Sequence, residues 1–212
     1  PSGSGKSTLG LQLAKKLGWH FLDSGIFYRI IGYLVLQRSI NLDDSIALQH
    51  SLDHLIVTLD DQGHLKELNG QAIDNQSFNK EKRLGQMASI VAQIPQVRQS
   101  LLVQQRACYH DDLPGLVAVG RDIGTIIFPQ APLKLFLTAT HSVRASRRFS
   151  QIQGQYQTTL EEVELSMSQR DQRDQKRETA PLKMGHDYKK IDTSHLTLKQ
   201  SLDKAINLWE NA

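Results

Sequence analysis

The segment Pro1-Ser-Gly-Ser-Gly-Lys-Ser-Thr8 decides the fold class of this chain of 212 residues. From its second position onward it matches the pattern of a phosphate-binding loop, in which glycines precede a lysine and a hydroxyl residue. Gly3 and Gly5 let the backbone turn its N–H groups toward phosphate oxygens. A helix beginning near Thr8 would aim its positive end at the same anion. The alternative, a glycine-serine linker before a helix, is disfavoured because the pattern requires several residue types at fixed spacing.

Two side chains of this loop carry chemistry. Lys6 is placed to reach the β- and γ-phosphates of ATP, and the Ser7 hydroxyl to take one coordination position on Mg²⁺. The pattern therefore predicts ATP as a substrate and Mg²⁺ as the metal cofactor. The expected ATP-binding residues are Pro1, Ser2, Gly3, Ser4, Gly5, Lys6, Ser7 and Thr8. Because such loops normally follow a buried strand, we expect a strand upstream of Pro1.

Composition and charge narrow the class of protein. Hydrophobic residues make up 39% and charged residues 22% of the chain, as in an ordinary soluble globular protein. No apolar run approaches the roughly 18–20 residues of a membrane span, so we expect no membrane association. The net charge of +3 suits a polyanionic small molecule and does not indicate a nucleic-acid polymer as partner. With the single cysteine Cys108 no internal disulfide forms, and we expect a monomer in the reducing cytoplasm.

Strands and helices alternate along the chain. Strands are expected at 19–22, 116–119, 133–137 and before 192, and a hairpin over 55–69. Helices are expected at 8–17, 26–37, after Asn41, at 79–94, from Pro95 to about Tyr109, within 142–177 and at the C-terminus to Trp209. This alternation predicts an α/β fold with a three-layer, doubly wound parallel sheet. In such folds ligands bind at the carboxyl ends of the strands, where Lys6, Asp23 and Arg121 fall.

Three further segments narrow the function. They are Leu22-Asp-Ser-Gly-Ile-Phe-Tyr-Arg29, then Gly120-Arg-Asp-Ile-Gly-Thr125 with the following Phe128-Pro-Gln-Ala-Pro-Leu-Lys-Leu-Phe-Leu-Thr-Ala139, and the charged run 169–177 with Ala180-Pro-Leu182. Together they strongly resemble the bacterial cytidylate kinase family. The resemblance covers essentially the whole chain in the right order, and the segments are specific in combination.

The resemblance implies an activity and a division of the chain. The activity is direct in-line transfer of the γ-phosphoryl group of ATP to CMP or dCMP, without a protein nucleophile. Residues 1–24, 110–141 and 178–212 would form the phosphate-loop core. Residues 25–109 would form an acceptor-nucleotide-binding region with a small β insert, and 142–177 a helical lid that keeps water from the γ-phosphate.

The resemblance also implies roles for individual residues. Arg29, Arg121 and Arg177 would clamp the phosphate of the acceptor nucleotide, which suits bidentate guanidinium groups. Arg170 and Asp174 would bind the sugar. The residues expected to read cytosine are Ser89, Arg98 and Asp122, with Ser24 in the same pocket.

Arg173 lies on the same charged segment and is placed to reach the transferring phosphoryl group. The expected catalytic residues are Lys6, Arg121, Arg173 and Arg177.

Several of these residues have a second interpretation. Arg170, Arg173 and Asp174 stand at three- and four-residue spacing with Arg177, so a solvated helix with internal ion pairs would look the same. Asp122 could cap the helix after its strand. Serine in a helix, as at Ser89, usually carries no function, and Arg29 could be a surface arginine. Arg144, Arg147 and Arg148 share a predicted helical face, either near ATP or as surface charge.

The chain departs from the family at one position. The family usually has an acidic residue two places before the arginine of its Gly-Arg-Asp motif, and here that residue is Val119. A carboxylate there would be expected to steady Mg²⁺ or its waters. Asp23 and Asp122 are the candidates to replace it.

Two rival functions stay open. One is phosphoryl transfer to another small acceptor, such as UMP, AMP or shikimate. The other is a nucleotide-binding regulatory switch that hydrolyses little. The combination of Arg98, Asp122 and the charged lid speaks against the first, and the lid arginines would have no obvious role in the second.

Overall fold

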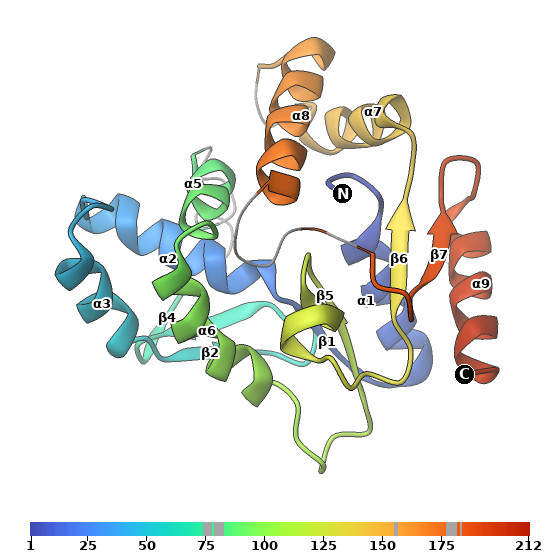
Figure 1. Ribbon diagram of the computed structural model, residues 1–212, viewed down its shortest axis with the longest axis horizontal. Helices are drawn as coiled ribbons and strands as arrows, with labels where there is room; N and C mark the ends of the chain where they lie inside the picture. Colours follow the sequence, from blue (N-terminus) through green and yellow to red (C-terminus); the bar gives the residue numbers. More distant parts are fainter. Residues whose placement is uncertain (74–77, 79–82, 155–156, 177–181, 183) are drawn as a thin grey trace. The chain divides into compact units, whose positions relative to one another are not determined.

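The computed structural model describes residues 1–73, 78, 83–154, 157–176, 182 and 184–212. Its helices and strands form two compact units. One, which we call the loop unit, comprises residues 1–17 and 121–212; the other, the central unit, comprises residues 18–120. Figure 1 colours both along the sequence.

The loop unit contains the phosphate loop, the helix α1 (Lys6–Leu17) and a parallel pair of strands, β6 (Leu135–Thr138) and β7 (Lys189–Asp192). The strands lie side by side, with Leu135 opposite Lys189 (Figure 1). The helix α9 (Leu198–Glu210) packs against α1. A capping box joins Thr197 and Gln200 and fixes the start of α9.

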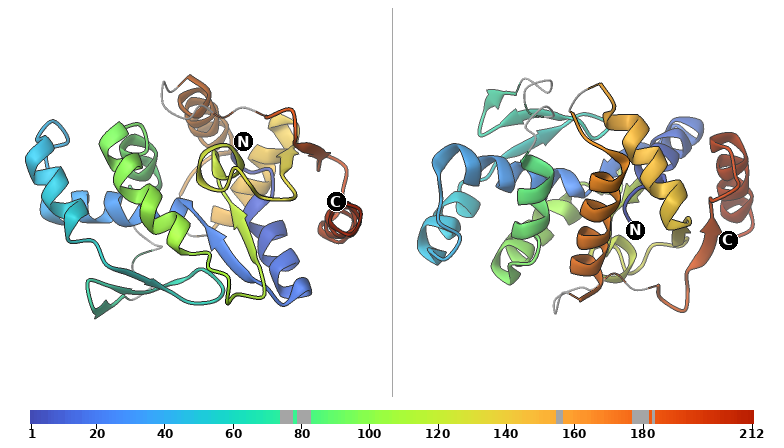
Figure 2. Two further views of the ribbon diagram at one scale, coloured as in Figure 1. Left: turned by 60° about the horizontal axis from the view of Figure 1, so that its bottom comes forward. Right: turned by 90° about the horizontal axis from the view of Figure 1, so that it is seen from above.

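The predicted lid consists of two helices, α7 (His141–Ile152) and α8 (Leu160–Lys176). They pack through a small core of Ala145, Val163 and Met167. Seen from above, the two helices lie beside each other (Figure 2). Most of the described residues between 142 and 176 are therefore helical, as expected.

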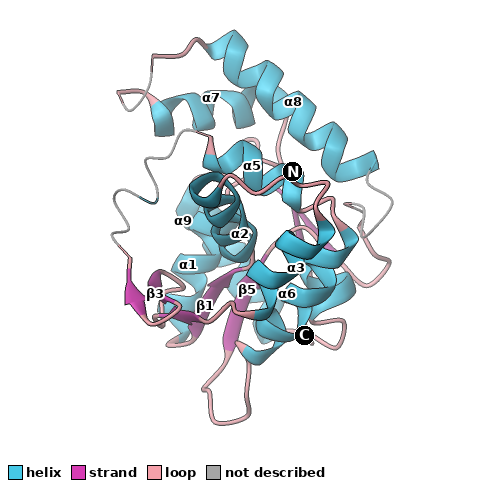
Figure 3. Cartoon of the chain, turned by 90° about the vertical axis from the view of Figure 1, so that its left-hand side faces the viewer, coloured by secondary structure: helices cyan, strands magenta, loops and turns pink. Residues whose placement is uncertain are grey.

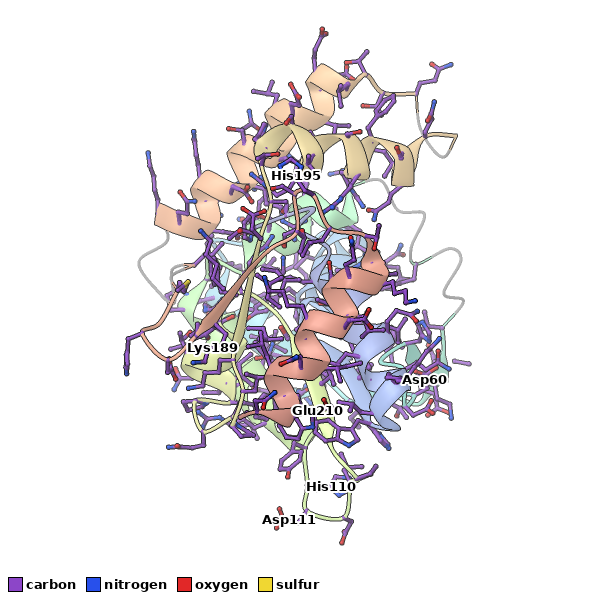
Figure 4. All side chains as sticks on the ribbon, turned by 90° about the vertical axis from the view of Figure 1, so that its right-hand side faces the viewer. Asp60, His110, Asp111, Lys189, His195 and Glu210 are labelled. Carbon is purple, nitrogen blue, oxygen red and sulfur yellow. The ribbon has the colours of Figure 1, made fainter. Side chains whose placement is uncertain are left out.

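The central unit also contains a parallel strand pair, β1 (His20–Asp23) and β5 (Leu116–Val119), shown in Figure 3. Its helices α2 (Gly25–Arg38) and α5 (Leu84–Val91) pack closely, as do α3 (Ser45–Asp53) and α6 (Pro95–Ala107). A Cβ atom on Gly32 would lie 3.1 Å from the backbone nitrogen of Ala88. Pro95 opens α6, as its position predicts. The loop from α6 to β5 carries His110 and Asp111 at its outer end (Figure 4).

The small β insert has one strand more than the predicted hairpin. β2 (Val57–Leu59), β3 (Leu65–Leu68) and β4 (Gln71–Ala72) form an antiparallel sheet in that order. The turn between β3 and β4 is Asn69-Gly70, with φ of 53° and 75°. An Asn-Gly pair is a strong signal for a tight hairpin turn, so the sequence held the information for this third strand.

The α/β class and the parallel pairing of strands are confirmed. The three-layer, doubly wound arrangement and the predicted domain boundaries stay predictions. The helix expected over 79–94 is seen as α5 from Leu84, and residues 79–82 lie outside the described residues. A π-helix, η1 (Ile123–Ile127), stands where an ordinary helix was expected after β5. Within the part of the chain that the structure describes, no helix is both long and apolar enough to cross a membrane.

Candidate active site

The phosphate loop curls around its own lysine. Gly3 and Gly5 have φ of 69° and 86°, a backbone conformation that favours glycine. The Lys6 ammonium donates hydrogen bonds to the Pro1 carbonyl oxygen at 2.5 Å and to the Ser4 hydroxyl at 3.4 Å. Ser4 is fully buried, and its own hydroxyl donates to the Pro1 carbonyl at 3.1 Å. The loop therefore has the compact form that its pattern predicts.

The helices α7 and α8 hold the start of this loop through a buried ion pair. Arg144 of α7 and Asp171 of α8 are each 8% exposed, and their Nη1 and Oδ2 atoms lie 2.5 Å apart. The Asp171 carboxylate accepts a hydrogen bond from the Ser2 N–H at 3.1 Å, while Arg144 donates to the Ser2 carbonyl at 2.8 Å. Arg144 is therefore an interior anchor of the loop, and its interpretation as surface charge was wrong.

The same two helices leave no room for a side chain after Ser2. A Cβ atom on Gly3 would lie 2.7 Å from the backbone oxygen of Arg144 and 3.0 Å from the Met167 methyl carbon. Gly3 is thus required both by its positive φ and by the close approach of α7.

Arg121 meets the loop at the same residue. Its Nη2 donates to the Ser2 hydroxyl at 2.9 Å, and its Nε lies 2.6 Å from Oδ2 of Asp174. Asp174 is 7% exposed and follows Asp171 by three residues on α8, so both carboxylates face the same side of that helix. The structure therefore brings Arg121 and Asp174 together.

The other charged residues of the lid differ in their surroundings. Arg170 is exposed by surface area, yet desolvation around its guanidinium, together with the positive charge of Arg121, lowers its pKa to about 10. It remains protonated at neutral pH, so two like charges lie near each other. Arg173 is half-buried and bonds the Gln169 carbonyl of its own helix at 3.3 Å. Arg177 lies outside the described residues.

Asp122 is 3% exposed and precedes the π-helix η1. Its backbone carbonyl accepts the first hydrogen bonds of that helix, from the N–H groups of Thr125 and Ile126. Within the described residues its side chain makes no capping hydrogen bond. The carboxylate therefore does not serve as the helix cap that was one interpretation of this residue.

A cavity of about 410 Å³ adjoins the phosphate loop within the loop unit. Gly3, Gly5 and Thr8 line it from the loop and the start of α1. Other lining residues come from α7 and from the chain after β7, among them Ser150, Gln151, Leu196 and Leu198.

Arg147 of α7, which lines this cavity, is connected to the phosphate loop through Thr193. It donates to the hydroxyl and carbonyl of Thr193 at 3.0 and 2.7 Å, and the Thr193 hydroxyl donates to the Ser4 carbonyl at 3.2 Å. Sequence reasoning missed Thr193, although its place just after the end of β7 is where ligand residues gather in such folds.

The expected base-reading residues of the central unit are buried. Ser24 is 3% exposed, and its carbonyl accepts a hydrogen bond from Gln105 at 3.5 Å. Arg98 is 7% exposed; it lies over the Tyr28 ring at 5.6 Å and donates to the Ala92 carbonyl at 3.2 Å. Arg98 thus has a fixed position with its guanidinium supported on one face.

Ser89 of α5 has an unusual environment. Its residue is 7% exposed, and its hydroxyl has no hydrogen-bond partner among the residues that the structure describes. A buried hydroxyl without a partner is destabilising, which indicates a group that a ligand satisfies. The environment of Ser89 therefore favours a ligand-binding role over the interpretation as a helical serine without function.

Two further positions of the central unit bear on the candidate site. They are Arg29 and Val119, where the family usually has an acidic residue. The Arg29 guanidinium lies 5.5 Å from the centre of the Phe78 ring. Val119 ends β5 opposite Asp23 of β1, and the Asp23 carboxylate accepts from the Gly25 N–H at 3.1 Å. A carboxylate is therefore present at this edge, one strand away from the usual place.

A phosphate-binding loop held by α7 and α8, with an arginine from outside the loop on its Ser2, places the chain in the phosphate-loop class of nucleotide-binding proteins. Comparison with known proteins gives the family. A family model described as cytidylate kinase matches residues 1–211. The chain belongs to this cytidylate kinase family, whose members are nucleoside monophosphate kinases.

Relatives agree with the family match. The chain is 41% identical over 212 residues to a cytidylate kinase of Pseudomonas syringae pv. tomato, with 98% of the chain and 91% of the relative covered. It is 39% identical over 210 residues to one from Pseudomonas fluorescens SBW25, with the same coverage. A cytidylate kinase of Photobacterium profundum is 37% identical over 217 residues, covering all of the chain and 92% of the relative.

Proposed function

We propose that this protein is a cytidylate kinase, which transfers the γ-phosphoryl group of ATP to CMP or dCMP and releases ADP with CDP or dCDP. Family membership supports the proposal. The observation that carries it is the hydrogen bond from Arg121 to the Ser2 hydroxyl at 2.9 Å. It joins the arginine expected at the acceptor phosphate to the loop expected at the phosphates of ATP. Direct transfer needs donor and acceptor groups about 3–3.5 Å apart, and this contact supports such an arrangement.

ATP is proposed to bind the loop from Pro1 to Thr8, with Lys6 at the β- and γ-phosphates and the N-terminus of α1 facing the same charge. Its nucleoside would then enter the adjoining cavity, because Gly3, Gly5 and Thr8 line both. A volume of about 410 Å³ suits a ligand of this size. The hydrogen bonds from Arg147 to Thr193 and from Thr193 to Ser4 would hold α7 and the end of β7 in a fixed position relative to the loop.

Mg²⁺ fits the donor set. Ser7 is exposed in the first turn of α1 and offers a hydroxyl oxygen. Mg²⁺ keeps several waters and takes phosphate oxygens, so it needs only one or two protein ligands. Among the described residues no group of three His, Cys, Asp or Glu side chains is arranged to hold a metal. When bound, the ion neutralises phosphate charge; Asp23 or Asp122 is proposed to steady its waters in place of an acid at Val119.

The acceptor's phosphate is proposed to bind Arg29, Arg121 and Arg177, and its sugar Arg170 and Asp174. The paired surroundings of Arg121 and Asp174, and the pKa of Arg170, support these roles in the loop unit. Catalysis would rest on charge neutralisation and positioning by Lys6, Arg121, Arg173 and Arg177, without a protein nucleophile.

Base choice is proposed to depend on Ser89, Arg98 and Asp122, with Ser24 nearby. Cytosine offers an amino donor at N4 and acceptors at N3 and O2, which suit a carboxylate and a guanidinium. Uracil has an acceptor at O4 and a donor at N3, so it would leave buried polar groups mismatched. The Ser89 hydroxyl, which has no partner within the part of the chain that the structure describes, supports a polar ligand at this place. Asp122→Ala should lower kcat/KM for CMP sharply and for UMP little; an equal fall on both would assign Asp122 another role.

The test is ADP release measured with CMP, dCMP, UMP, AMP, shikimate and no acceptor. We expect ADP formation that depends on CMP or dCMP. A faster rate with another acceptor would favour a different small-molecule kinase. Slow, acceptor-independent ADP formation would favour the regulatory switch. The expected monomeric state in the cytoplasm stays a prediction, and size-exclusion chromatography with light scattering tests the monomer.

A further inference from the structure

Ser2 lies where two arginine–carboxylate pairs meet. The first pair, Arg144–Asp171, binds its backbone on both sides: the carboxylate accepts from its N–H and the guanidinium donates to its carbonyl. The second pair, Arg121–Asp174, reaches its side chain through the 2.9 Å bond to the hydroxyl. One residue of the loop thus contacts the lid and the acceptor arginine through different atoms.

The backbone contacts fix the orientation of Ser2. Hydrogen bonds to both polar groups of one residue leave its flanking peptides little freedom to rotate, and Gly3 beside it is closed in by Arg144. Burial by itself raises the pKa of the Asp171 carboxyl, but the Ser2 N–H and the Arg144 guanidinium outweigh burial and hold that pKa below its usual value. The pair is therefore ionised at neutral pH, so these contacts persist under assay conditions.

The side-chain contact makes Arg121 dependent on the loop. The guanidinium has one partner on the loop, Ser2, and one on the lid, Asp174. Both carboxylates project from the same face of α8, so movement of α8 acts on the backbone of Ser2 and on Arg121 together. Any change of the loop on binding phosphates reaches Arg121 through the Ser2 hydroxyl.

We propose that Ser2 is a positioning residue that couples the ATP-binding loop to Arg121, and that the Arg144–Asp171 pair holds it in place for this task. Binding of ATP on the loop then prepares Arg121 for the acceptor phosphate, and binding of either nucleotide strengthens binding of the other. This inference rests on the proposed function, because it takes Arg121 as a ligand of the acceptor phosphate. Reciprocity is required by thermodynamics, so the coupling can be measured from either side.

The experiment measures the Kd of CMP by calorimetry with and without a saturating, non-hydrolysable ATP analogue and Mg²⁺. We expect the analogue to tighten CMP binding by about fivefold or more in the unchanged protein. Ser2→Ala should reduce this factor to below about twofold; because the factor is a ratio of two CMP affinities of the same variant, it separates the coupling from any change in affinity for the analogue itself. Ser2→Thr keeps a hydroxyl and should restore the coupling.

Asp171→Asn tests the second part of the proposal. It should lower the coupling factor as Ser2→Ala does, whereas Asp187→Asn, which removes an ion pair with Lys134 in the same unit, should leave it intact. Thermal unfolding of each variant separates a folded protein from an unfolded one, and Ser2→Ala decides the matter if Asp171→Asn does not fold.

Full coupling in Ser2→Ala, or no coupling in the unchanged protein, would overturn the inference. Failure of the proposed function looks different, because the acceptor panel would then show no ADP formation that depends on CMP, and calorimetry no binding of CMP. An unchanged protein that turns over CMP but whose coupling ignores Ser2 would leave the proposed function standing and remove only the coupling.

Discussion

The two units support their arginines in different ways. In the loop unit Arg121 and Arg144 are paired with carboxylates at 2.6 and 2.5 Å. In the central unit Arg98 and Arg29 lie over the rings of Tyr28 and Phe78. At Arg121 the Asp174 carboxylate would compete with the proposed acceptor phosphate for the same N–H donors, whereas the Arg144–Asp171 pair is also held by the backbone of Ser2. An aromatic face contacts a guanidinium above its plane and so does not compete for its in-plane hydrogen bonds, one of which Arg98 donates to the Ala92 carbonyl.

Removal of the phosphate-binding charge should have the largest effect. Lys6→Ala is expected to remain folded and to lose turnover by about 10³-fold or more, or roughly 4 kcal/mol of transition-state stabilisation. Steady-state kinetics with CMP, alongside circular dichroism, checks this. Near-normal turnover in a folded variant would remove the loop from the mechanism.

Arg121→Met and Arg98→Met test the comparison between the units. Loss of a phosphate clamp should lower kcat/KM for CMP and UMP by a similar factor, about 100-fold, since both substrates carry the same phosphate. Arg98→Met keeps an unbranched side chain against Tyr28, and it should lower kcat/KM for CMP at least about tenfold more than for UMP.

The ratio of CMP to UMP efficiency is the quantity to compare between these two variants. If it narrows in Arg121→Met and stays constant in Arg98→Met, the assignment of phosphate and base roles to the two units is reversed.

The buried Arg144–Asp171 pair should make a contribution to the free energy of unfolding that is lost at low pH. The pKa of Asp171 is depressed in the folded state, so its contribution is present above the unfolded-state pKa and is lost as pH falls through the folded-state pKa. Asp171→Asn should therefore lower the free energy of unfolding by about 2 kcal/mol, uniformly from pH 5 to 8, with the difference shrinking below about pH 4.

Denaturant unfolding at several pH values measures this difference. Both proteins should carry His141→Gln, which removes the ring whose nitrogen lies 3.3 Å from Arg144 Nη2, so that the comparison rests on the Arg144–Asp171 pair. A difference that grows as the pH is lowered from 5 to 3 would contradict the assigned direction.

Ser89→Ala should give the smallest effect and the clearest separation of function from stability. Removal of a buried hydroxyl that has no partner among the described residues should leave the free energy of unfolding unchanged or raise it by up to about 1 kcal/mol. The efficiency on CMP should fall by roughly five- to tenfold, since one hydrogen bond to the ligand is lost.

Ser51→Ala is the matched control in the same unit. Ser51 is buried on α3, but its hydroxyl donates to the Ala47 carbonyl at 3.2 Å. Its loss should therefore lower stability by about 1 kcal/mol and leave the efficiency on CMP unchanged. If the two variants behave alike, the Ser89 hydroxyl has no ligand-binding role.

The local features of the protein were open to prediction from sequence. The loop from Pro1 to Thr8 needs only neighbouring residues, because its glycine backbone and the helix after it are set within a few positions of the chain. The insert's third strand could also have been found, from Asn69-Gly70. The family followed from several such local segments in their order along the chain, and the comparison confirmed it.

Tertiary structure alone decided the partners of Ser2. Asp171 lies 169 residues further along the chain and Arg121 lies 119 residues away, so neither contact leaves a trace in local spacing. On sequence, Asp171 is one acid within a charged run, and Arg144 shares a helical face with Arg147 and Arg148. Which of these charges is buried depends on the packing of α7 and α8 against the loop, because desolvation and pairing arise only when distant segments meet.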